Sequence, residues 1–151
     1  MILIFFGPPG AGKGTQANLI ANYLDIPHLS TGNIFREKLL ENDAISKKIK
    51  NILDSGQLIS DTITNEVIYE RLKNNDCSNG FILDGYPRTL SQANFLEKVL
   101  NNQNKNIDFV IDILIDEKVI FQRIKSRSNI ENRADDNEEV VKTRIENYLE
   151  E

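Results

Sequence analysis

Residues that build metal centres and disulfides are scarce in this sequence. Its 151 residues contain one cysteine, one histidine and no tryptophan. A single thiol can form neither an intramolecular disulfide nor a cysteine-rich zinc site. We therefore expect Cys77 to be reduced and the protein to be cytoplasmic. His28 has no histidine, cysteine or acidic pair near it at ligand spacing, and we interpret it as a structural residue.

Long apolar runs and an excess of positive charge are missing as well. The apolar run after Met1 covers residues 2–6, which is too short for a signal peptide or a membrane span, and no other run approaches membrane length. The formal net charge is -5, whereas nucleic-acid-binding domains are usually basic. We therefore expect neither a membrane nor a nucleic acid as partner. An acidic protein can still bind nucleotides in a local basic cleft.

What the sequence does contain is a glycine-rich segment at residues 7–15, with the sequence Gly-Pro-Pro-Gly-Ala-Gly-Lys-Gly-Thr. It lies between the apolar run and an amphipathic segment at residues 16–24, an order that predicts strand, loop and helix. Glycines let backbone N–H groups converge on an anion, and the following helix adds its N-terminal N–H groups. Lys13 adds a full positive charge. The segment therefore predicts binding of a nucleoside di- or triphosphate.

One position in this loop departs from the general phosphate-loop pattern. That pattern has serine or threonine directly after the lysine, whereas here Gly14 follows Lys13 and Thr15 comes one residue later. The hydroxyl group is thus shifted along the chain, which leaves its role at a magnesium ion open.

The remaining periodicity predicts an α/β fold. Four apolar runs read as strands, and because they do not alternate with polar residues we expect each strand to be covered on both faces. Helical patterns lie between them, so we predict a doubly wound parallel sheet with helices on both faces. The predicted strands are residues 2–6, 27–30, 80–84 and 109–115. The predicted helices are residues 16–24, 33–40, 44–54, 61–74, 90–100, 117–125 and 138–151.

In such folds ligands bind beyond the carboxyl ends of the strands. Three polar segments follow the first three predicted strands, at residues 7–15, 30–32 and 84–89, and we expect them to open on one rim. Asp84 ends an apolar run, where a carboxylate can orient water bound to magnesium. Its alternative role is to cap the following turn.

The arginines are few, and most of them fall in segments that can face this rim. Guanidinium groups bind phosphate oxygens in two-pronged geometry, and phosphoryl transfer depends on such electrostatic stabilisation. Arg71 is the exception, because it falls on the polar face of a predicted helix, and we interpret it as solvated. The arginines expected at the rim are Arg36, Arg88, Arg123, Arg127, Arg133 and Arg144.

Taken together, these segments resemble the nucleoside monophosphate kinases, and closely the adenylate kinases. The resemblance covers the whole chain in family order. It implies a reversible, magnesium-dependent transfer of the γ-phosphoryl group of ATP to AMP, giving two ADP, and it implies no zinc. The matching segments are residues 7–15, 29–32 (Leu-Ser-Thr-Gly), 84–89 (Asp-Gly-Tyr-Pro-Arg-Thr) and 133–139 (Arg-Ala-Asp-Asp-Asn-Glu-Glu).

The resemblance also implies roles for individual residues. It implies that Lys13 acts at the transferred phosphate, that Asp84 holds magnesium through water, and that Arg36 and Arg88 grip the AMP phosphate. The implied catalytic residues are Lys13, Arg88, Arg123, Arg133 and Arg144. The implied ATP site is Gly10, Ala11, Gly12, Lys13, Gly14, Thr15, Arg123 and Arg127. The implied AMP site is Thr31, Arg36, Gln57, Leu58, Ile59, Gly85, Tyr86, Pro87, Arg88, Gln92, Arg133 and Arg144.

The same resemblance implies a division into domains. The core would comprise residues 1–29, 61–125 and 138–151, with a moving AMP-binding insertion at residues 30–60 and a short lid at residues 126–137. Family members continue into a last strand, a loop that clasps the ATP adenine and a terminal helix. If the protein stops at Glu151 we expect weak ATP binding and poor activity. If the chain is the full-length protein, we expect it to be a monomer.

Two alternatives to an adenylate kinase stay open at this point. The first is a UMP or CMP kinase of the same family. Such relatives carry alanine in place of Thr31 and asparagine in place of Thr89, and Gln92 can pair with adenine as both donor and acceptor, so the residues here favour AMP. The second is a protein that binds nucleotides with little activity. It could be a sensor, for which the arginine set would be unnecessary, or a fragment that keeps the fold but not the function.

Overall fold

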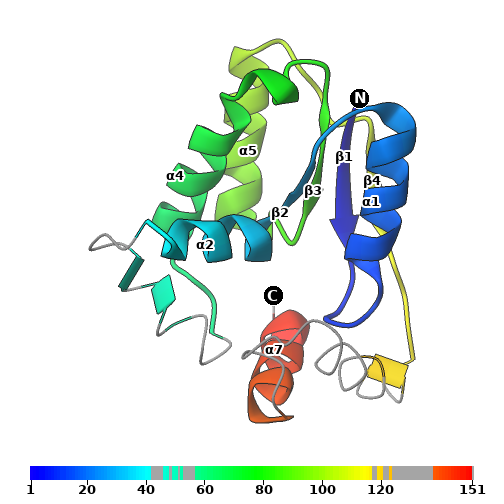
Figure 1. Ribbon diagram of the computed structural model, residues 1–151, viewed down its shortest axis with the longest axis vertical. Coiled ribbons are helices and arrows are strands. Elements are labelled where there is room, and N and C mark those ends of the chain that lie inside the picture. Colours follow the sequence, from blue (N-terminus) through cyan, green and yellow to red (C-terminus); the bar gives the residue numbers. More distant parts are fainter. Residues whose placement is uncertain are drawn as a thin grey trace.

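The computed structural model describes residues 1–41, 46–47, 49–50, 52, 57–116, 119–120, 123 and 138–150. Within these residues four parallel strands form one sheet in the order β2-β3-β1-β4 (Figure 1). The predicted α/β class with a parallel sheet is confirmed, and the last strand is three residues shorter than predicted. The strands are β1 (Ile2–Phe6), β2 (His28–Ser30), β3 (Phe81–Asp84) and β4 (Phe109–Asp112).

The described helices follow the predicted order. Helix α1 begins three residues before the prediction because Gly12, with a φ of 94°, caps it directly after the glycine-rich loop. The predicted helices at 44–54 and 117–125 lie mostly outside the described residues, but those described there are helical. The described helices are α1 (Lys13–Leu24), α2 (Thr31–Leu39), α4 (Asp61–Leu72), the 3-10 helix η1 (Asn75–Cys77), α5 (Leu90–Asn102) and α7 (Glu138–Glu150).

Helices cover both faces of the sheet, as predicted. Side chains alternate along β1, so that Ile2 and Ile4 join a core cluster with α4 and α5, whereas Leu3 and Phe5 join a second cluster with α1. Figure 1 shows α4 and α5 on one side of the sheet and α1 on the other. The apolar runs are therefore explained by two cores that share one sheet.

Strand β4 corrects one expectation. It pairs with β1 along one edge, but Phe109 and Val110 are 61% and 58% exposed. Ile111 reaches the α1 side of the core and is only partly buried. The prediction that every strand is covered on both faces is thus wrong for β4, because an apolar run reports hydrophobicity and not the presence of a covering element.

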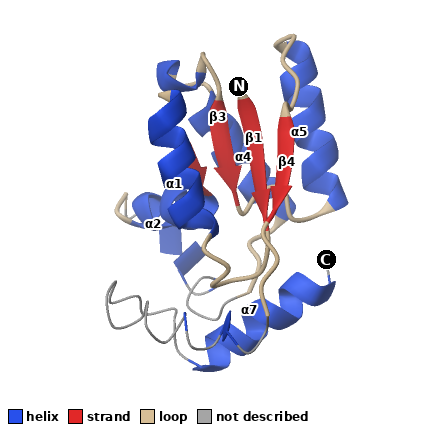
Figure 2. Ribbon diagram, turned by 90° about the vertical axis from the view of Figure 1, so that its right-hand side faces the viewer, coloured by secondary structure: helices blue, strands red, loops and turns tan. Residues whose placement is uncertain are grey.

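Two smaller apolar clusters arrange segments at the carboxyl ends of the strands. Phe35 of α2 packs with Ile49 and Ile59, separately from the sheet. Val141 of α7 packs with Ile120. Figure 2 shows the strand arrows pointing toward α7. These clusters bring α2, residues 57–59 and α7 to the end of the sheet where the predicted rim lies.

A membrane-crossing helix would need a longer apolar stretch than any helix offers among the residues that the structure describes.

Candidate active site

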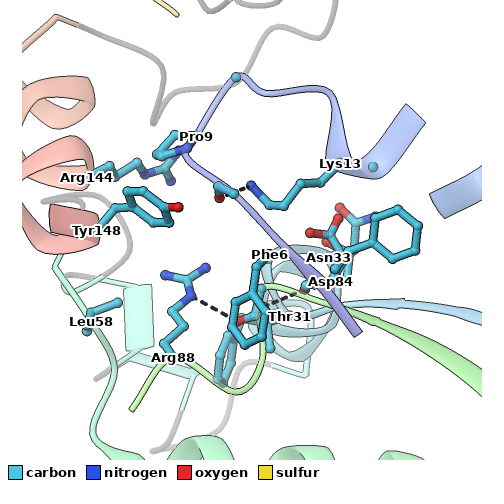
Figure 3. Close-up of a pocket in the computed structure, with 18 of the residues that line it drawn as sticks. Phe6, Pro9, Lys13, Thr31, Asn33, Leu58, Asp84, Arg88, Arg144 and Tyr148 are labelled. Atoms are coloured by element: carbon cyan, nitrogen blue, oxygen red, sulfur yellow. Dashed lines mark hydrogen bonds between the residues drawn. The ribbon is translucent and has the colours of Figure 1, made fainter. Parts of the chain in front are cut away.

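A cavity of about 1090 Å³ opens at the carboxyl ends of the strands (Figure 3). Segments far apart in the sequence line it: the glycine-rich loop, the start of α2, residues 57–59, the loop between β3 and α5, Arg123 and helix α7. The three segments expected to open on one rim therefore do share one cavity, and its size suits a ligand of nucleotide dimensions.

The glycine-rich loop is shaped by glycines in left-handed conformations. Gly10 has a φ of 80°, and Gly7 leaves no room for a side chain, because a Cβ there would lie 2.6 Å from the carbonyl oxygen of Ile113. Lys13 Nζ donates hydrogen bonds to the carbonyl oxygens of Gly7 at 2.7 Å and Pro8 at 2.9 Å. The ammonium group thus lies against the loop at the start of α1, where the N–H groups of a helix attract anions.

Asp84 lies beside this loop and is not isolated. His28 Nε2 is 3.2 Å from Asp84 Oδ2, and His28 Nδ1 is 2.7 Å from Asn18 Oδ1. The side chains of His28 and Asp84 are 9% and 11% exposed. His28 was predicted to be structural only. Its position in β2 was the available signal. His28 and Ser30 lie on one face of β2, and the parallel register sets Ser30 opposite Asp84.

The loop after β3 holds Arg88 in the cavity. Gly85 has a φ of 78°, and a Cβ there would lie 2.6 Å from Thr31 Oγ1, so this turn requires glycine. Thr31 Oγ1 contacts the carbonyl oxygens of Asp84 at 3.0 Å and Gly85 at 2.9 Å. Arg88 Nε donates to the Gly85 carbonyl oxygen at 2.9 Å. The Gly85 carbonyl oxygen therefore orients the Arg88 side chain, and the same hydrogen bond stabilises the turn.

Two guanidinium groups lie toward one another across the cavity. Desolvation by the surrounding protein lowers the pKa of Arg88, and repulsion from Arg144 lowers it further, while Asp84 opposes both effects. Figure 3 shows Arg144 reaching in from α7 and Arg88 from the opposite wall. Guanidinium groups keep their charge in proteins, so the space between the two arginines favours an anion.

Gln92 is held by partners on both ends of its side-chain amide. Its Oε1 accepts a hydrogen bond from the backbone N–H of Arg88 at 2.7 Å, and its Nε2 donates to Asp61 Oδ1 at 2.8 Å. Asp61 Oδ2 accepts from Thr89 Oγ1 at 2.8 Å. Gln92 is 3% exposed, yet it lines the cavity. Asp61 is a residue that the sequence analysis missed.

Most of the predicted site residues that the structure describes meet in this cavity. Arg123 donates to the Ala11 carbonyl oxygen at 3.2 Å, which brings it to the glycine-rich loop. Arg127, Arg133 and the predicted lid lie outside the described residues. The predicted residues that line the cavity are Gly10, Gly12, Lys13, Gly14, Thr15, Thr31, Arg36, Gln57, Leu58, Ile59, Asp84, Gly85, Pro87, Arg88, Gln92, Arg123 and Arg144.

Two predicted residues that the structure describes, Ala11 and Tyr86, do not line the cavity. Ala11 is 5% exposed and Tyr86 is fully buried. Tyr86 donates from its hydroxyl to Asn65 Oδ1 at 2.6 Å, and burial raises its pKa well above the ordinary value, with a smaller contribution from Asp61. The structure thus gives Tyr86 a packing role behind the cavity wall.

Helix α7 contributes lining residues that the sequence analysis did not name. Asn147 and Tyr148 line the cavity together with Arg144, and Figure 3 shows the Tyr148 ring beside Arg144. The signal that could have found Tyr148 is its spacing, because residues four apart lie on one face of a helix.

The structure corrects the interpretation of Arg71 as merely solvated. Its guanidinium donates to both carboxylate oxygens of Asp76, at 2.8 and 2.6 Å. Cys77, next to this pair, is buried, and burial raises the pKa of its thiol to about 11. Neither Arg71 nor Cys77 lines the cavity. Cys77 ends the helix η1 that precedes β3, so this cluster lies toward the amino ends of the parallel strands.

The donor set fits magnesium that arrives with phosphates. Among the described residues there is no group of three acidic, histidine or cysteine side chains suited to a metal ion. Magnesium usually keeps several waters and is held by one or two carboxylates together with substrate phosphates. Asp84, beside the glycine-rich loop, is a carboxylate of this kind.

Comparison with known proteins gives one consistent family. The family model described as adenylate kinase matches residues 5–151. An adenylate kinase of Chelativorans sp. (strain BNC1) is 45% identical, over 98% of this chain and 79% of the relative. One of Cyanothece sp. (strain PCC 7425 / ATCC 29141) is 47% identical, over 97% and 75%. One of Thermobifida fusca (strain YX) is 42% identical, over 99% and 79%.

These matches run through the residues that build the cavity. The parallel sheet described above is consistent with this family. This chain belongs to the adenylate kinase family and is a nucleoside monophosphate kinase.

Proposed function

We propose that the protein transfers the γ-phosphoryl group of ATP to AMP, reversibly, giving two ADP, in the cavity at the carboxyl ends of the strands. The observation that carries this proposal is the meeting of Lys13 with the facing pair Arg88 and Arg144 in one cavity. A phosphate loop at one end and guanidinium groups at the other suit a donor and an acceptor that both carry phosphates.

Each end of the cavity has its own task in this proposal. The loop from Gly10 to Thr15 binds the ATP phosphates, and Lys13 leaves the Gly7 and Pro8 carbonyls to meet the transferred group. Arg123, which contacts the loop at Ala11, meets ATP from the other side. Phosphoryl transfer is accelerated mainly by positioning and by stabilisation of the developing charge, which these fixed cations supply.

The AMP phosphate is gripped by Arg36 and Arg88, and Arg144 closes on the transferring group. Asp84 is the residue that would hold magnesium, through water. Magnesium supplies charge neutralisation across the ATP phosphates. His28 and Asn18 keep the Asp84 carboxylate in place on the loop side of the cavity.

AMP is the acceptor that the residues favour over UMP or CMP. Gln92 and Thr31, at the positions where the family contacts adenine, line one wall of the cavity. The relatives described above are all named adenylate kinase. The pyrimidine alternative has no comparable support.

The division into domains stays a prediction, with partial support. The separate apolar cluster of Phe35, Ile49 and Ile59 suits an AMP-binding unit at residues 30–60 that moves on its own. Closure of this unit would keep water away from the phosphoryl group. The cytoplasmic location and the monomeric state also stay predictions.

The test is the rate of ADP formation from magnesium and ATP with AMP, CMP or UMP, at equal concentrations. We expect the highest kcat/KM with AMP. A preference for CMP or UMP would contradict the choice of acceptor, and hydrolysis of ATP without any acceptor dependence would contradict the proposed transfer.

A further inference from the structure

We propose that Asp61 is a specificity-determining residue, because it locks the orientation of the Gln92 side-chain amide and so decides which purine the acceptor site reads. Asp61 lies at the first position of α4, whereas Gln92 lines the cavity from α5. The inference rests on the proposed function, in which the acceptor base lies against Gln92.

The lock follows from the chemistry of the two partners of the amide. The Asp61 carboxylate can only accept hydrogen bonds, and it accepts from Gln92 Nε2 at 2.8 Å. The backbone N–H of Arg88 can only donate, and it donates to Gln92 Oε1 at 2.7 Å. A flipped amide would place its oxygen against a carboxylate and its NH₂ group against an N–H. Both contacts would become repulsive, so one orientation is strongly preferred.

Asp61 is itself held in place. Its second carboxylate oxygen accepts from Thr89 Oγ1 at 2.8 Å, and Thr89 Oγ1 in turn accepts from the backbone N–H of Gln92 at 3.1 Å, as the N-cap of α5. The three side chains therefore form a closed ring across two helices. Gln92 is 3% exposed, so water offers little competition for these bonds.

A locked amide distinguishes bases that differ only in the direction of their hydrogen bonds. After its bonds to Asp61 and Arg88, the amide keeps one N–H donor and one oxygen lone pair for a ligand. Adenine offers an acceptor at N1 and a donor at its 6-amino group. Hypoxanthine, the base of IMP, has nearly the same shape but offers a donor at N1 and an acceptor at O6. Only a flipped amide could satisfy hypoxanthine.

The test compares AMP and IMP in the wild-type chain and in Asp61→Asn, by calorimetric binding and by kcat/KM as phosphoryl acceptors. The carboxamide introduced by Asp61→Asn can accept from or donate to the amide, so it tolerates both orientations. We expect the wild type to prefer AMP, and the ratio of AMP to IMP, in affinity and in kcat/KM, to fall about tenfold in the variant, which is the discrimination typical of one well-placed pair of hydrogen bonds.

The matched control is Asn65→Ala on the same helix. It removes one of the two partners of the Tyr86 hydroxyl, the other being the Gln92 backbone carbonyl oxygen, and it leaves both partners of the Gln92 side-chain amide. We expect it to lower the melting temperature without changing the AMP to IMP ratio. A purely structural role for Asp61 would give the same pattern for Asp61→Asn, a lower melting temperature with an unchanged ratio, and that result would overturn the proposal.

Two further outcomes are distinguishable. A wild-type chain that binds neither nucleotide would contradict the proposed function itself, and the inference with it. If Asp61→Asn does not fold, NMR of the Gln92 side-chain amide in the wild type with AMP decides. We expect the Nε2 proton that is donated to Asp61 to exchange slowly with water. Rapid exchange of this proton would overturn the lock.

Discussion

The two ends of the cavity hold their polar groups in different ways. At the loop end, Lys13 bonds to carbonyl oxygens of its own loop, at Gly7 and Pro8. At the other end, Gln92 is bonded to Asp61 and to the Arg88 backbone, which belong to different elements of the chain. Phosphate oxygens can replace the partners of Lys13 with little rearrangement, whereas those of Gln92 are built into the fold.

This difference matches the demands that the two kinds of ligand group make on direction. A long, flexible lysine side chain can bind anionic groups that approach from different directions, because its ammonium group acts as a point charge. An amide that reads a base makes strong demands on direction, so its orientation has to be fixed before the ligand arrives. We therefore expect substitutions at the loop end to change turnover, and substitutions behind the base-reading end to change selectivity and stability.

The largest expected effect comes from Lys13→Ala, which removes the charge of the loop end. We expect turnover to fall by about a thousandfold, as is typical when an electrostatic contact to the transition state is lost. The assay is coupled ADP formation, with circular dichroism to check the fold. Lys98→Ala, on the exposed part of α5, is the control and should leave turnover unchanged. Near wild-type turnover in Lys13→Ala would show that the charge at the loop end is not needed for phosphoryl transfer.

A smaller effect is expected from Gly85→Ala at the base-reading end. The new Cβ would lie 2.6 Å from Thr31 Oγ1, in a backbone conformation with a φ of 78°. We expect a loss of about 2 kcal/mol in the free energy of unfolding, measured in urea. Gly12→Ala also has a positive φ, but its Cβ would meet its nearest group, Arg123, at 3.6 Å, so its loss should be smaller. Equal losses would mean that the two ends are equally rigid.

The smallest effect is expected outside the cavity, from Asp76→Asn. The hydrogen bond from Arg71 lowers the pKa of Asp76, with a further coulombic contribution from Arg71 against a desolvation that raises it. A carboxylate with a lowered pKa stabilises the folded state above its unfolded-state pKa of about 3.9, and this stability is lost as the pH falls through the folded-state pKa.

Asp76→Asn should therefore cost less than about 1 kcal/mol near neutral pH, since the pair is exposed, and the variant should lose less stability than wild type on acidification. Urea unfolding at several pH values below about 5 measures this difference. Glu97→Gln, an exposed change on α5, controls for net charge. A change in turnover would show that this distant pair is coupled to the cavity.

Local sequence was enough to predict much of the fold. The glycine-rich loop and its flanking strand and helix depend on neighbouring residues, and the structure has them in the predicted order, with the helix beginning three residues early at Lys13. The exposure of β4 was not predictable from its apolar sequence, because exposure depends on what covers a strand. Arg71 was also misread, since its partner Asp76 lies beyond the end of its helix.

The site shows the same division. Lys13, Asp84 and Arg88 could be named from motifs, because phosphate chemistry calls for those residue types at those positions. The hydrogen bond between His28 and Asp84 joins residues 56 apart in the chain, and the hydrogen bond between Gln92 and Asp61 joins residues 31 apart. No spacing rule for a single element predicts such pairs.

Short-range periodicity and glycine placement therefore predict the parallel α/β fold and a rim whose residue types suit phosphate binding. The pairing of Asp84 with His28 and of Asp61 with the amide of Gln92 is seen only in the folded protein. The physical reason is that these hydrogen bonds form between separate elements, and their direction is set by how the sheet and helices pack and not by the local chain.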